Sequence, residues 1–348
     1  MPLRVVGRDQ MRWQVRGWPG IIAGVTGDGA VQWRAITADD GAEWARLVLA
    51  VEESYGTDDI VGAEDLVEDL RDPYVDPARG TLAAFSGGSM IAYAGLRASP
   101  SVTGRHEMEL DGAVHPGQRG RGLGTRLLAW AEQAALPLHH ARYPGHPLAL
   151  SASCPAGQGD ALALFGAAGY QQARWFHFMS RDLTGPVLDR QLPEGTRLAG
   201  YAAELSQAAR QVRDEAFRDH WGSTQTTAES WQHFVGHESF RPSFSFLAYL
   251  GDKPAGVLIA REYDAVRQAT GRRECYIAAV GVTKTARGRG IASALIRRSL
   301  AAAQADGCNV ATLYVDADSP TGALTLYEHT GFTKQRTSVT LIKDLADQ

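Results

Sequence analysis

The sequence has few cysteines and no long apolar run, and both absences narrow what the protein can be. Its three cysteines, Cys154, Cys275 and Cys308, lie far apart without CxxC spacing, which argues against a disulfide framework and against a zinc site. No apolar segment approaches the length of a membrane span. The stretch "GWPGIIAGV" at 17–25 is too short and too badly flanked to be a signal peptide. We therefore expect a cytoplasmic protein with neither a bound metal nor a membrane partner.

An excess of basic residues is also missing. The formal net charge is −4 at pH 7 and the pI is about 6.2, so little positive charge is available to neutralise phosphates, and nucleic acid is not expected as a partner. What the chain does have is length and apolar content, with 348 residues of which 44% are hydrophobic. Such a chain can bury a full core, and its length favours two domains.

An Arg/Gly-rich segment occurs twice, as "GQRGRGLGTRLL" at 117–128 and as "TARGRGIASALI" at 285–296. Each copy follows the fourth expected strand of its half and leads into an amphipathic helix, at 122–135 and 290–306. Each half then ends on a strand, which we place at 171–180 in the first half. The last strand of the second half is expected at 333–343. A period this long indicates duplicated domains rather than a solenoid.

Domain limits follow from this repeat. We expect an N-terminal domain at 31–182 and a C-terminal domain at 199–348, joined by a linker at 183–198 in which prolines and glycines interrupt regular structure. Residues 1–30 show no sustained hydrophobic period and are interpreted as an N-terminal extension. The expected fold class is α/β, with mixed sheets.

The repeated loop is suited to binding an anion. A Gly-rich turn between a strand and a helix directs successive backbone N–H groups into one concavity. Gly122 and Gly290 remove a Cβ atom at the point of closest approach, and the neighbouring arginines add positive charge. The loop is not a P-loop, because GxxxxGK is absent, and its place after a fourth strand does not fit a dinucleotide-binding fold.

The pattern Arg/Gln-x-x-Gly-x-Gly/Ala, present at 119–124 and 287–292, resembles the pyrophosphate loop of the GNAT superfamily of acetyl-CoA-dependent N-acetyltransferases. The resemblance implies two tandem GNAT domains, in which the fourth and fifth strands of each sheet diverge around the pantetheine arm of acetyl-CoA. It also implies the residues that hold this cofactor. In the first half these are Val114, Arg119, Gly120, Arg121, Gly122, Leu123, Gly124 and Thr125; in the second they are Val280, Val282, Arg287, Gly288, Arg289, Gly290, Ile291, Ala292 and Ser319.

The second half resembles the superfamily further. The segment "LYVDADSPTGALTLYEHTGF" at 313–332 is similar to the family's closing strand and helix, which implies that Tyr327 is the general acid at the thioester sulfur. Glu274, at the start of the fourth strand "ECYIAAVGV", is the implied general base, acting directly or through a water. This strand and the tandem arrangement are most similar to the mycothiol synthases and their uncharacterised actinobacterial relatives.

Other residues allow competing interpretations. Cys275 lacks a histidine at recognisable spacing, so we interpret it as a buried small hydrophobe. His139 and the nearby His140 and His146 match no metal spacing and are expected in a solvated loop. Glu107 and Glu109, on one face of a strand, are either a base in the first half or merely charged residues on the sheet surface.

Comparison of the two halves predicts which one is catalytic. Aligning "LFGAAGY" with "LYEHTGF" places Phe165 opposite Tyr327, and counting back from the two loops without a gap places His106 opposite Glu274. The first half therefore lacks the expected acid. We expect it to be non-catalytic, although its loop can still bind acetyl-CoA.

The sequence leaves three functions open. The first is acetyl transfer by direct attack of a primary amine of a small molecule or peptide, and the second is mycothiol synthase activity on a cysteinyl amine. The third is a non-catalytic sensor that binds acyl-CoA. The sequence determines neither the acceptor nor whether the protein is a monomer or a homodimer.

Overall fold

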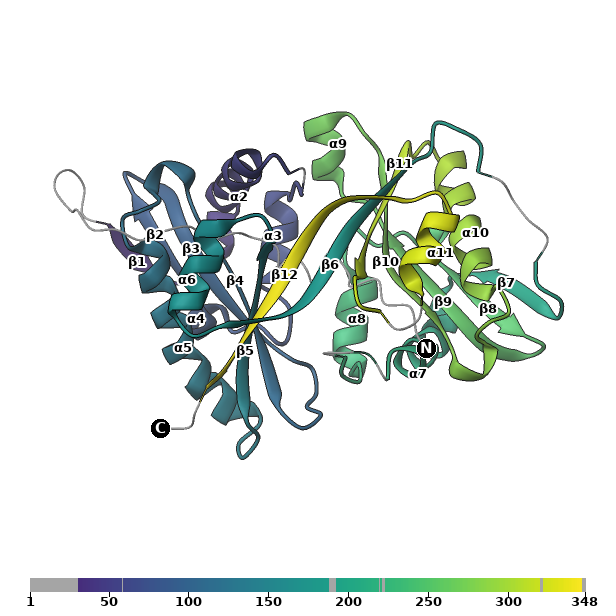
Figure 1. Cartoon of the computed structure of the whole chain (residues 1–348), viewed down its shortest axis with the longest axis horizontal. Helices are drawn as coiled ribbons and strands as arrows, with labels where there is room; N and C mark the ends of the chain where they lie inside the picture. The colour runs from purple at the N-terminus through teal and green to yellow at the C-terminus, as the bar shows by residue number, and fades with distance from the viewer. Residues whose placement is uncertain are drawn as a thin grey trace. The chain divides into compact units, whose positions relative to one another are not determined.

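The computed structural model describes residues 31–57, 59–187, 192–218, 220, 223–319 and 322–345. The extension expected at 1–30 lies outside these residues. The chain divides into two compact units (Figure 1). Their described residues are 31–175 with 337–345, here called the N-terminal unit, and 176–336, here called the C-terminal unit.

The N-terminal unit is a mixed sheet covered by helices. Its sheet has the order β1-β2-β3-β4-β5-β12, and only the β4–β5 pair is parallel. The elements of this part of the chain are β1 (Gln32–Arg34), α2 (Gly41–Tyr55), α3 (Ala63–Asp69), α4 (Pro77–Gly80), β2 (Thr81–Ser86), β3 (Ser89–Ala98), β4 (His106–Val114), α5 (Leu123–Arg142), β5 (Leu148–Pro155), α6 (Gly159–Ala167) and β6 (Gln171–Asp182).

The C-terminal unit repeats this plan, with the sheet order β6-β11-β10-β9-β8-β7 and a single parallel pair, β10–β11. Its elements are β7 (Thr196–Gly200), α7 (Ser206–Phe217), α8 (Ala228–Gly236), β8 (Phe246–Leu250), β9 (Lys253–Arg261), α9 (Asp264–Thr270), β10 (Glu274–Val282), α10 (Ile291–Ala305), β11 (Val310–Asp316), α11 (Ala323–His329) and β12 (Thr333–Leu345). The mixed α/β fold and the duplication are confirmed.

The two units exchange their closing strands. Residues 176–182 of β6 pair antiparallel with β11 of the C-terminal unit, and residues 338–345 of β12 pair antiparallel with β5 of the N-terminal unit. Figure 1 shows these strands as the long teal and yellow ribbons that pass from one unit to the other. The compact units therefore differ from the sequence ranges 31–182 and 199–348, because each contains the last strand of the other half.

Each exchanged strand contributes to the core that it joins. Met179 of β6 is fully buried in the core of the C-terminal unit, together with apolar residues of α10. Val339 and Leu341 of β12, two residues apart and so on one face of the strand, are buried in the core of the N-terminal unit with residues of α5. Burial of these side chains therefore stabilises the unit that each strand joins, which is formed mainly by the other half of the sequence.

Other expectations need adjustment. β7 begins at Thr196, inside the stretch 183–198 that the sequence indicates as a linker, and α9 was not expected at all. Helix α5 continues to Arg142, past the expected end at 135, although Pro137 lies within it. Its last turns are retained because Leu138 and His139 are buried against the sheet.

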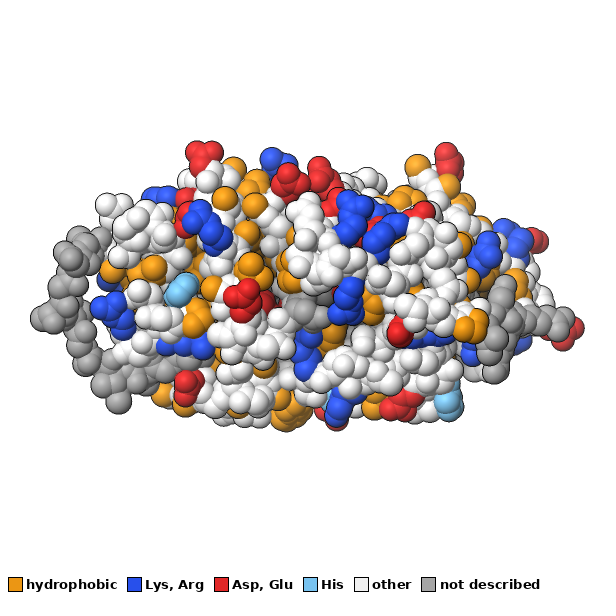
Figure 2. All heavy atoms as spheres, turned by 90° about the horizontal axis from the view of Figure 1, so that it is seen from above, with side chains coloured by type: hydrophobic (Ala, Val, Ile, Leu, Met, Phe, Trp, Pro, Cys, Tyr) orange, Lys and Arg blue, Asp and Glu red, His pale blue; other side chains and the backbone are white. Residues whose placement is uncertain are grey.

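On the face of the molecule shown in Figure 2, Lys and Arg side chains lie among Asp and Glu side chains.

A buried pair of histidines corrects one prediction. His139 does not lie in a solvated loop with His140 and His146; it is in α5, fully buried, and its Nδ1 is 2.8 Å from Nδ1 of His106, which is also fully buried. The Tyr143 ring contacts the His106 ring edge-on, with 4.7 Å between centroids. Burial, and then the neighbouring His139, Arg142 and His146, lower the pKa of His106 to about 4.

The exchange predicts that a core substitution in a closing strand destabilises the unit that the strand joins, which is the C-terminal unit for β6 and the N-terminal unit for β12. Leu341→Ala should destabilise the N-terminal unit by about 2–5 kcal/mol, and Met179→Ala should destabilise the C-terminal unit similarly, because each leaves a cavity. Hydrogen exchange of β5 amides should accelerate in the first variant, and that of β11 amides in the second. Acceleration confined to the unit nearer in sequence would contradict the exchange.

The histidine pair predicts a pH dependence of stability. Because the pKa of His106 falls from 6.5 to about 4 on folding, its contribution is complete above pH 6.5 and is lost as the pH falls toward 4. Chemical denaturation followed over this range should show a smaller loss for His106→Gln than for the unaltered protein. The exposed neighbour His140→Gln is the matched control, and should behave like the unaltered protein. Equal losses in all three proteins would assign the acid sensitivity to other groups.

Candidate active site

The one parallel strand pair in each sheet is short, and beyond it the strands diverge. In the N-terminal unit only residues 106–109 of β4 pair with β5, and in the C-terminal unit only residues 274–276 of β10 pair with β11. The strands themselves continue to Val114 and to Val282. We call this divergence the fork. Past the fork, the main-chain N–H and C=O groups on the facing edges of the two strands no longer form hydrogen bonds with each other. They are therefore able to bind a ligand.

Each fork is followed by a loop in which two glycines adopt a left-handed conformation. The φ angles are 74° and 77° at Gly120 and Gly122, and 75° and 80° at Gly288 and Gly290. A side chain at such φ angles is strained, which explains the glycines at both positions. Neither α5 nor α10 has a side-chain N-cap, so the first-turn N–H groups of each helix are left for an anion. We call residues 120–125 and 288–292 the two nests.

The arginines of the loops fall into two kinds. Arg119 donates from Nη2 to Ser54 Oγ at 2.8 Å and stacks over the Tyr55 ring at 4.8 Å, both at the end of α2. Arg287 donates from Nε to the carbonyl oxygen of Val282 at 3.2 Å. Arg119 therefore attaches its loop to the end of α2. Arg287 attaches its loop to the end of β10. Arg121 and Arg289, in contrast, are exposed and can contribute charge at the rim of each nest.

A β-bulge distinguishes the two units. The register of β10 against β9 shifts between Ile277 and Ala279, so that Ala278 is the extra residue, whereas β4 pairs with β3 without interruption. A bulge leaves one residue unpaired and disturbs the ladder locally. In the C-terminal unit it therefore frees main-chain groups two residues beyond the last β10–β11 pair.

The bulge also corrects the alignment of the two halves. In β4, the residues that face the core have even numbers, as in Met108 and Leu110. In β10, they change from odd numbers, ending at Ile277, to even numbers, beginning at Val280. One residue must therefore be skipped when counting back through β10. Glu274 then stands opposite Glu107, and the gap-free match to His106 is wrong. No residue type marks the bulge in the sequence, because the residues next to it are small or apolar.

Glu274 lies on the paired side of the fork. It is the first residue of β10, is paired with Val310, and is only 4% exposed. Its neighbour Cys275 belongs to the core cluster that also contains Tyr327, so strand alternation puts the Glu274 side chain on the opposite face of the sheet. Burial raises the pKa of Cys275 well above its usual value. The side chains of Glu274 and Tyr327 therefore lie on opposite faces of the sheet. Cys275 is a buried thiol, as the sequence predicts.

Tyr327 lies in α11 and is fully buried. Among the residues that the structure describes, its hydroxyl has no hydrogen-bond partner, and burial raises its pKa, so it remains a proton donor. The Phe332 ring contacts it edge-on, with 5.9 Å between centroids. In the N-terminal unit the corresponding pair is Phe165 and Tyr170, 5.2 Å apart, so the hydroxyl there is carried by the other member.

The remaining residues implied by the resemblance also have definite places. Val114, Val280 and Val282 have buried side chains within the core clusters, so only their main-chain groups can face a ligand. Ser319 follows β11, is half-buried, and its N–H donates to the carbonyl oxygen of Asp316 at 3.2 Å. No described helix is long and apolar enough to cross a membrane.

A nest at a helix N-terminus next to a fork is suited to a long ligand with a diphosphate at one end. The model of the Acetyltransferase (GNAT) family matches residues 45–143 and 206–332, one match in each half of the chain. The chain belongs to the GNAT family of acetyltransferases. It is therefore an acyltransferase, and acetyl-CoA is its acetyl donor; the two nests and forks fit the diphosphate and the pantetheine arm of that molecule.

Known proteins extend this assignment. The chain is 31% identical to a mycothiol acetyltransferase of Salinispora tropica, over 86% of this chain and 92% of the relative. It is 34% identical to a mycothiol acetyltransferase of Thermobispora bispora, over 73% and 80% of the two chains. A GCN5-related N-acetyltransferase from Sphaerobacter thermophilus superposes with a TM-score of 0.73 at 26% identity, covering 91% and 96%. The predicted similarity of this tandem GNAT to the mycothiol synthases is confirmed.

The paired nests predict up to two coenzyme A sites per chain. Calorimetric titration should show that Gly122→Glu removes the site of the N-terminal unit and Gly290→Glu that of the C-terminal unit, since each adds strain and a carboxylate where an anion binds. Gly104→Glu and Gly271→Glu are matched controls, because these glycines also have positive φ angles, of 85° and 70°, but lie outside the nests. Binding that survives substitution of both nests would contradict this assignment.

Proposed function

We propose that the C-terminal unit is the catalytic centre and that it transfers an acetyl group to a primary amine of a small molecule or peptide, with Tyr327 as general acid and Glu274 as general base. The observation that carries this proposal is the difference between the units. The C-terminal unit has both the bulge beside its fork and a tyrosine at position 327 of α11, whereas the N-terminal unit has an uninterrupted β4 and has Phe165 at the corresponding position, with the hydroxyl carried by Tyr170.

The roles of the chain's own groups follow from their places. We propose that the nest at 288–292 holds the diphosphate of acetyl-CoA, that the main chain of Val280 and Val282 holds the pantetheine arm, and that Ser319 lies beside it. Acetyl-CoA supplies an acetyl group activated as a thioester. The main-chain groups freed at Ala278 are the proposed donors to the acetyl carbonyl oxygen, because preorganised donors stabilise the charge that develops there.

Two proton transfers complete the proposal. Tyr327, which burial keeps protonated by raising its pKa, donates from its hydroxyl to the departing sulfur. Glu274 accepts the proton that the acceptor amine loses. Because it lies on the paired side of the fork, we propose that this proton reaches it through water rather than directly.

In the N-terminal unit, we propose that the nest at 120–125 with Arg119 and the main chain of Val114 binds acetyl-CoA without turnover. A cysteinyl amine, as in mycothiol synthesis, is the second candidate acceptor. It is supported by the relatives named as mycothiol acetyltransferases, which match most of this chain.

A panel of primary amines, including cysteinyl glucosaminyl inositol, tests the proposal by thiol release and by the mass shift of the acceptor. Tyr327→Phe should lower kcat by about 10²- to 10⁴-fold with little change in acetyl-CoA affinity, because it removes a group used in the transition state. Phe165→Tyr is the matched change in the other unit, and should leave kcat unaltered.

The same panel separates the alternatives. Binding of coenzyme A without thiol release from any amine would favour the sensor function. Full activity of Tyr327→Phe, together with inactivity of folded Gly122→Glu, would place catalysis in the N-terminal unit instead.

A further inference from the structure

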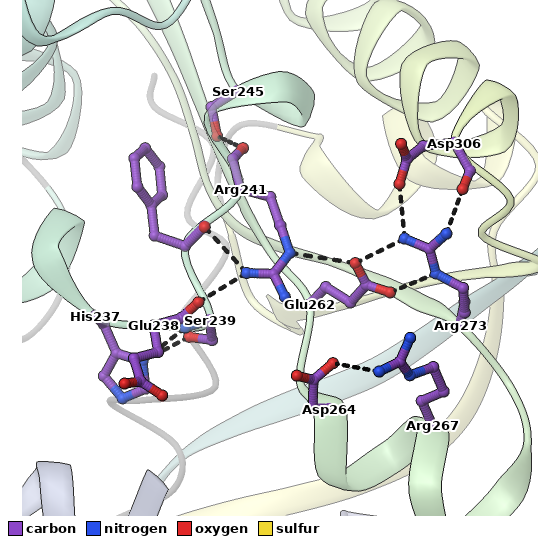
Figure 3. Close-up of polar contacts among 11 residues, drawn as sticks. His237, Glu238, Ser239, Arg241, Ser245, Glu262, Asp264, Arg267, Arg273 and Asp306 are labelled. Carbon is purple, nitrogen blue, oxygen red and sulfur yellow. Dashed lines mark hydrogen bonds and ion pairs between the residues drawn. The ribbon is translucent and has the colours of Figure 1, made fainter. Parts of the chain in front are cut away.

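Glu262 directly follows β9, and its buried carboxylate binds two arginines (Figure 3). Arg273 donates from Nε to Oε1 at 2.7 Å and from Nη2 to Oε2 at 3.0 Å. Arg241 donates from Nε to Oε2 at 3.2 Å. Burial by itself would raise the pKa of Glu262, but the hydrogen bonds from Arg273 and Arg241 outweigh it and lower the pKa. Glu262 is therefore an ionised group held between two cations.

Arg273 extends these contacts to two further elements. Its Nη2 donates to Oδ2 of Asp306 at 2.6 Å, and its Nη1 donates to the Asp306 carbonyl oxygen, at the C-cap of α10. Its own carbonyl oxygen accepts the N–H of Asn309 at 3.0 Å, immediately before β11. The side chain and main chain of one residue thus join the end of α10 and the starts of β10 and β11.

The loop before β8 is tied to the same place. The N–H of Arg241 donates to the carbonyl oxygen of Ala260 at 3.0 Å, and the N–H of Glu262 donates to that of Ser239 at 2.9 Å. Arg241 therefore holds β9 through its main chain as well as its guanidinium. We call Arg241, Glu262, Arg273 and Asp306 together the clamp.

The clamp lies at the start of the short parallel pair formed by β10 and β11, where neighbouring residues must help to hold the two strands together. Only three residues of β10 pair with β11, so this ladder alone specifies the register weakly. From Tyr276 onward β10 is also held by its ladder with β9, so a slip by one residue concerns the start of the strand, where it would exchange the faces of Glu274 and Cys275. Arg273 directly precedes Glu274, so a fixed Arg273 prevents that slip.

We propose that Glu262 is a positioning residue that, through Arg273, sets the register of the first residues of β10 and thereby the face on which Glu274 lies. The proposal rests on the role of Glu274 in the proposed function. The N-terminal unit differs at the matching position. With the extra residue Ala278 skipped, His106 stands opposite Arg273, and it contacts His139 of α5 at 2.8 Å rather than a carboxylate.

Glu262→Gln tests the proposal, because it keeps the shape of the side chain but removes the charge that holds both arginines. The expected result is a fall in kcat of about 10- to 100-fold, since small displacements of a catalytic group are costly. Coenzyme A affinity should stay within about twofold of the unaltered value, because the nest is at the other end of β10. Hydrogen exchange of the amides of residues 274–276 should accelerate by about tenfold or more.

Asp264→Asn is the matched control. Asp264 pairs with Arg267 at 3.4 Å in α9, and both side chains are more than half exposed (Figure 3), so the same change of carboxylate to amide should alter neither kcat nor exchange at 274–276. Arg273→Lys tests the other partner: it should lower kcat similarly, because lysine cannot make the bidentate contact.

The outcomes distinguish this proposal from the proposed function. If the unaltered protein acetylates no amine, the proposed function fails, and amide exchange at 274–276 in Glu262→Gln still decides whether the clamp sets β10. If the unaltered protein is active and Glu262→Gln keeps full kcat and unaltered exchange, the clamp is overturned. A lower melting temperature with unaltered kcat and exchange would show a role in general stability only, and would also overturn it.

Discussion

The brevity of the parallel pairing between the two central strands is the constraint on which both units depend. β10 and β11 share three paired residues, and β4 and β5 share four. Each strand must then be held by its other neighbour, because the facing edges part. β9 and β3 hold β10 and β4, while the exchanged strands β6 and β12 hold β11 and β5. The fork therefore stays open because antiparallel ladders on both sides support its arms.

The two units use this scaffold differently. Both keep a nest with glycines in left-handed conformation, so both retain the means of binding a diphosphate. Only the C-terminal unit interrupts its fourth strand with a bulge. The tyrosine and phenylalanine that pack together after the fifth strand are also transposed, as Tyr327 with Phe332 and as Phe165 with Tyr170. One main-chain insertion and one transposed hydroxyl thus separate two otherwise similar sites.

The sequence predicted those features that depend on distinctive residue types. Glycine at 120, 122, 288 and 290 reveals the nests, because few other residues tolerate their φ angles. The bulge at Ala278 was not predictable, because its apolar neighbours hide the change of parity. The strand exchange was equally hidden, because Val339 and Leu341, on one face of β12, could line the core of either sheet. The expected end of the helix at 135 came too early, because burial of Leu138 and His139 retains α5 beyond Pro137.

The exchange of β6 and β12 has a consequence for biosynthesis. The N-terminal unit needs residues 338–345 to complete the sheet beside β5, and these emerge from the ribosome about 180 residues after β5 itself. At the usual rates of translation this delay is on the order of ten seconds or more. During that interval the edge of β5 is open to incorrect pairing with other chains. The sheet of the N-terminal unit can therefore be completed only after residues 338–345 have been made.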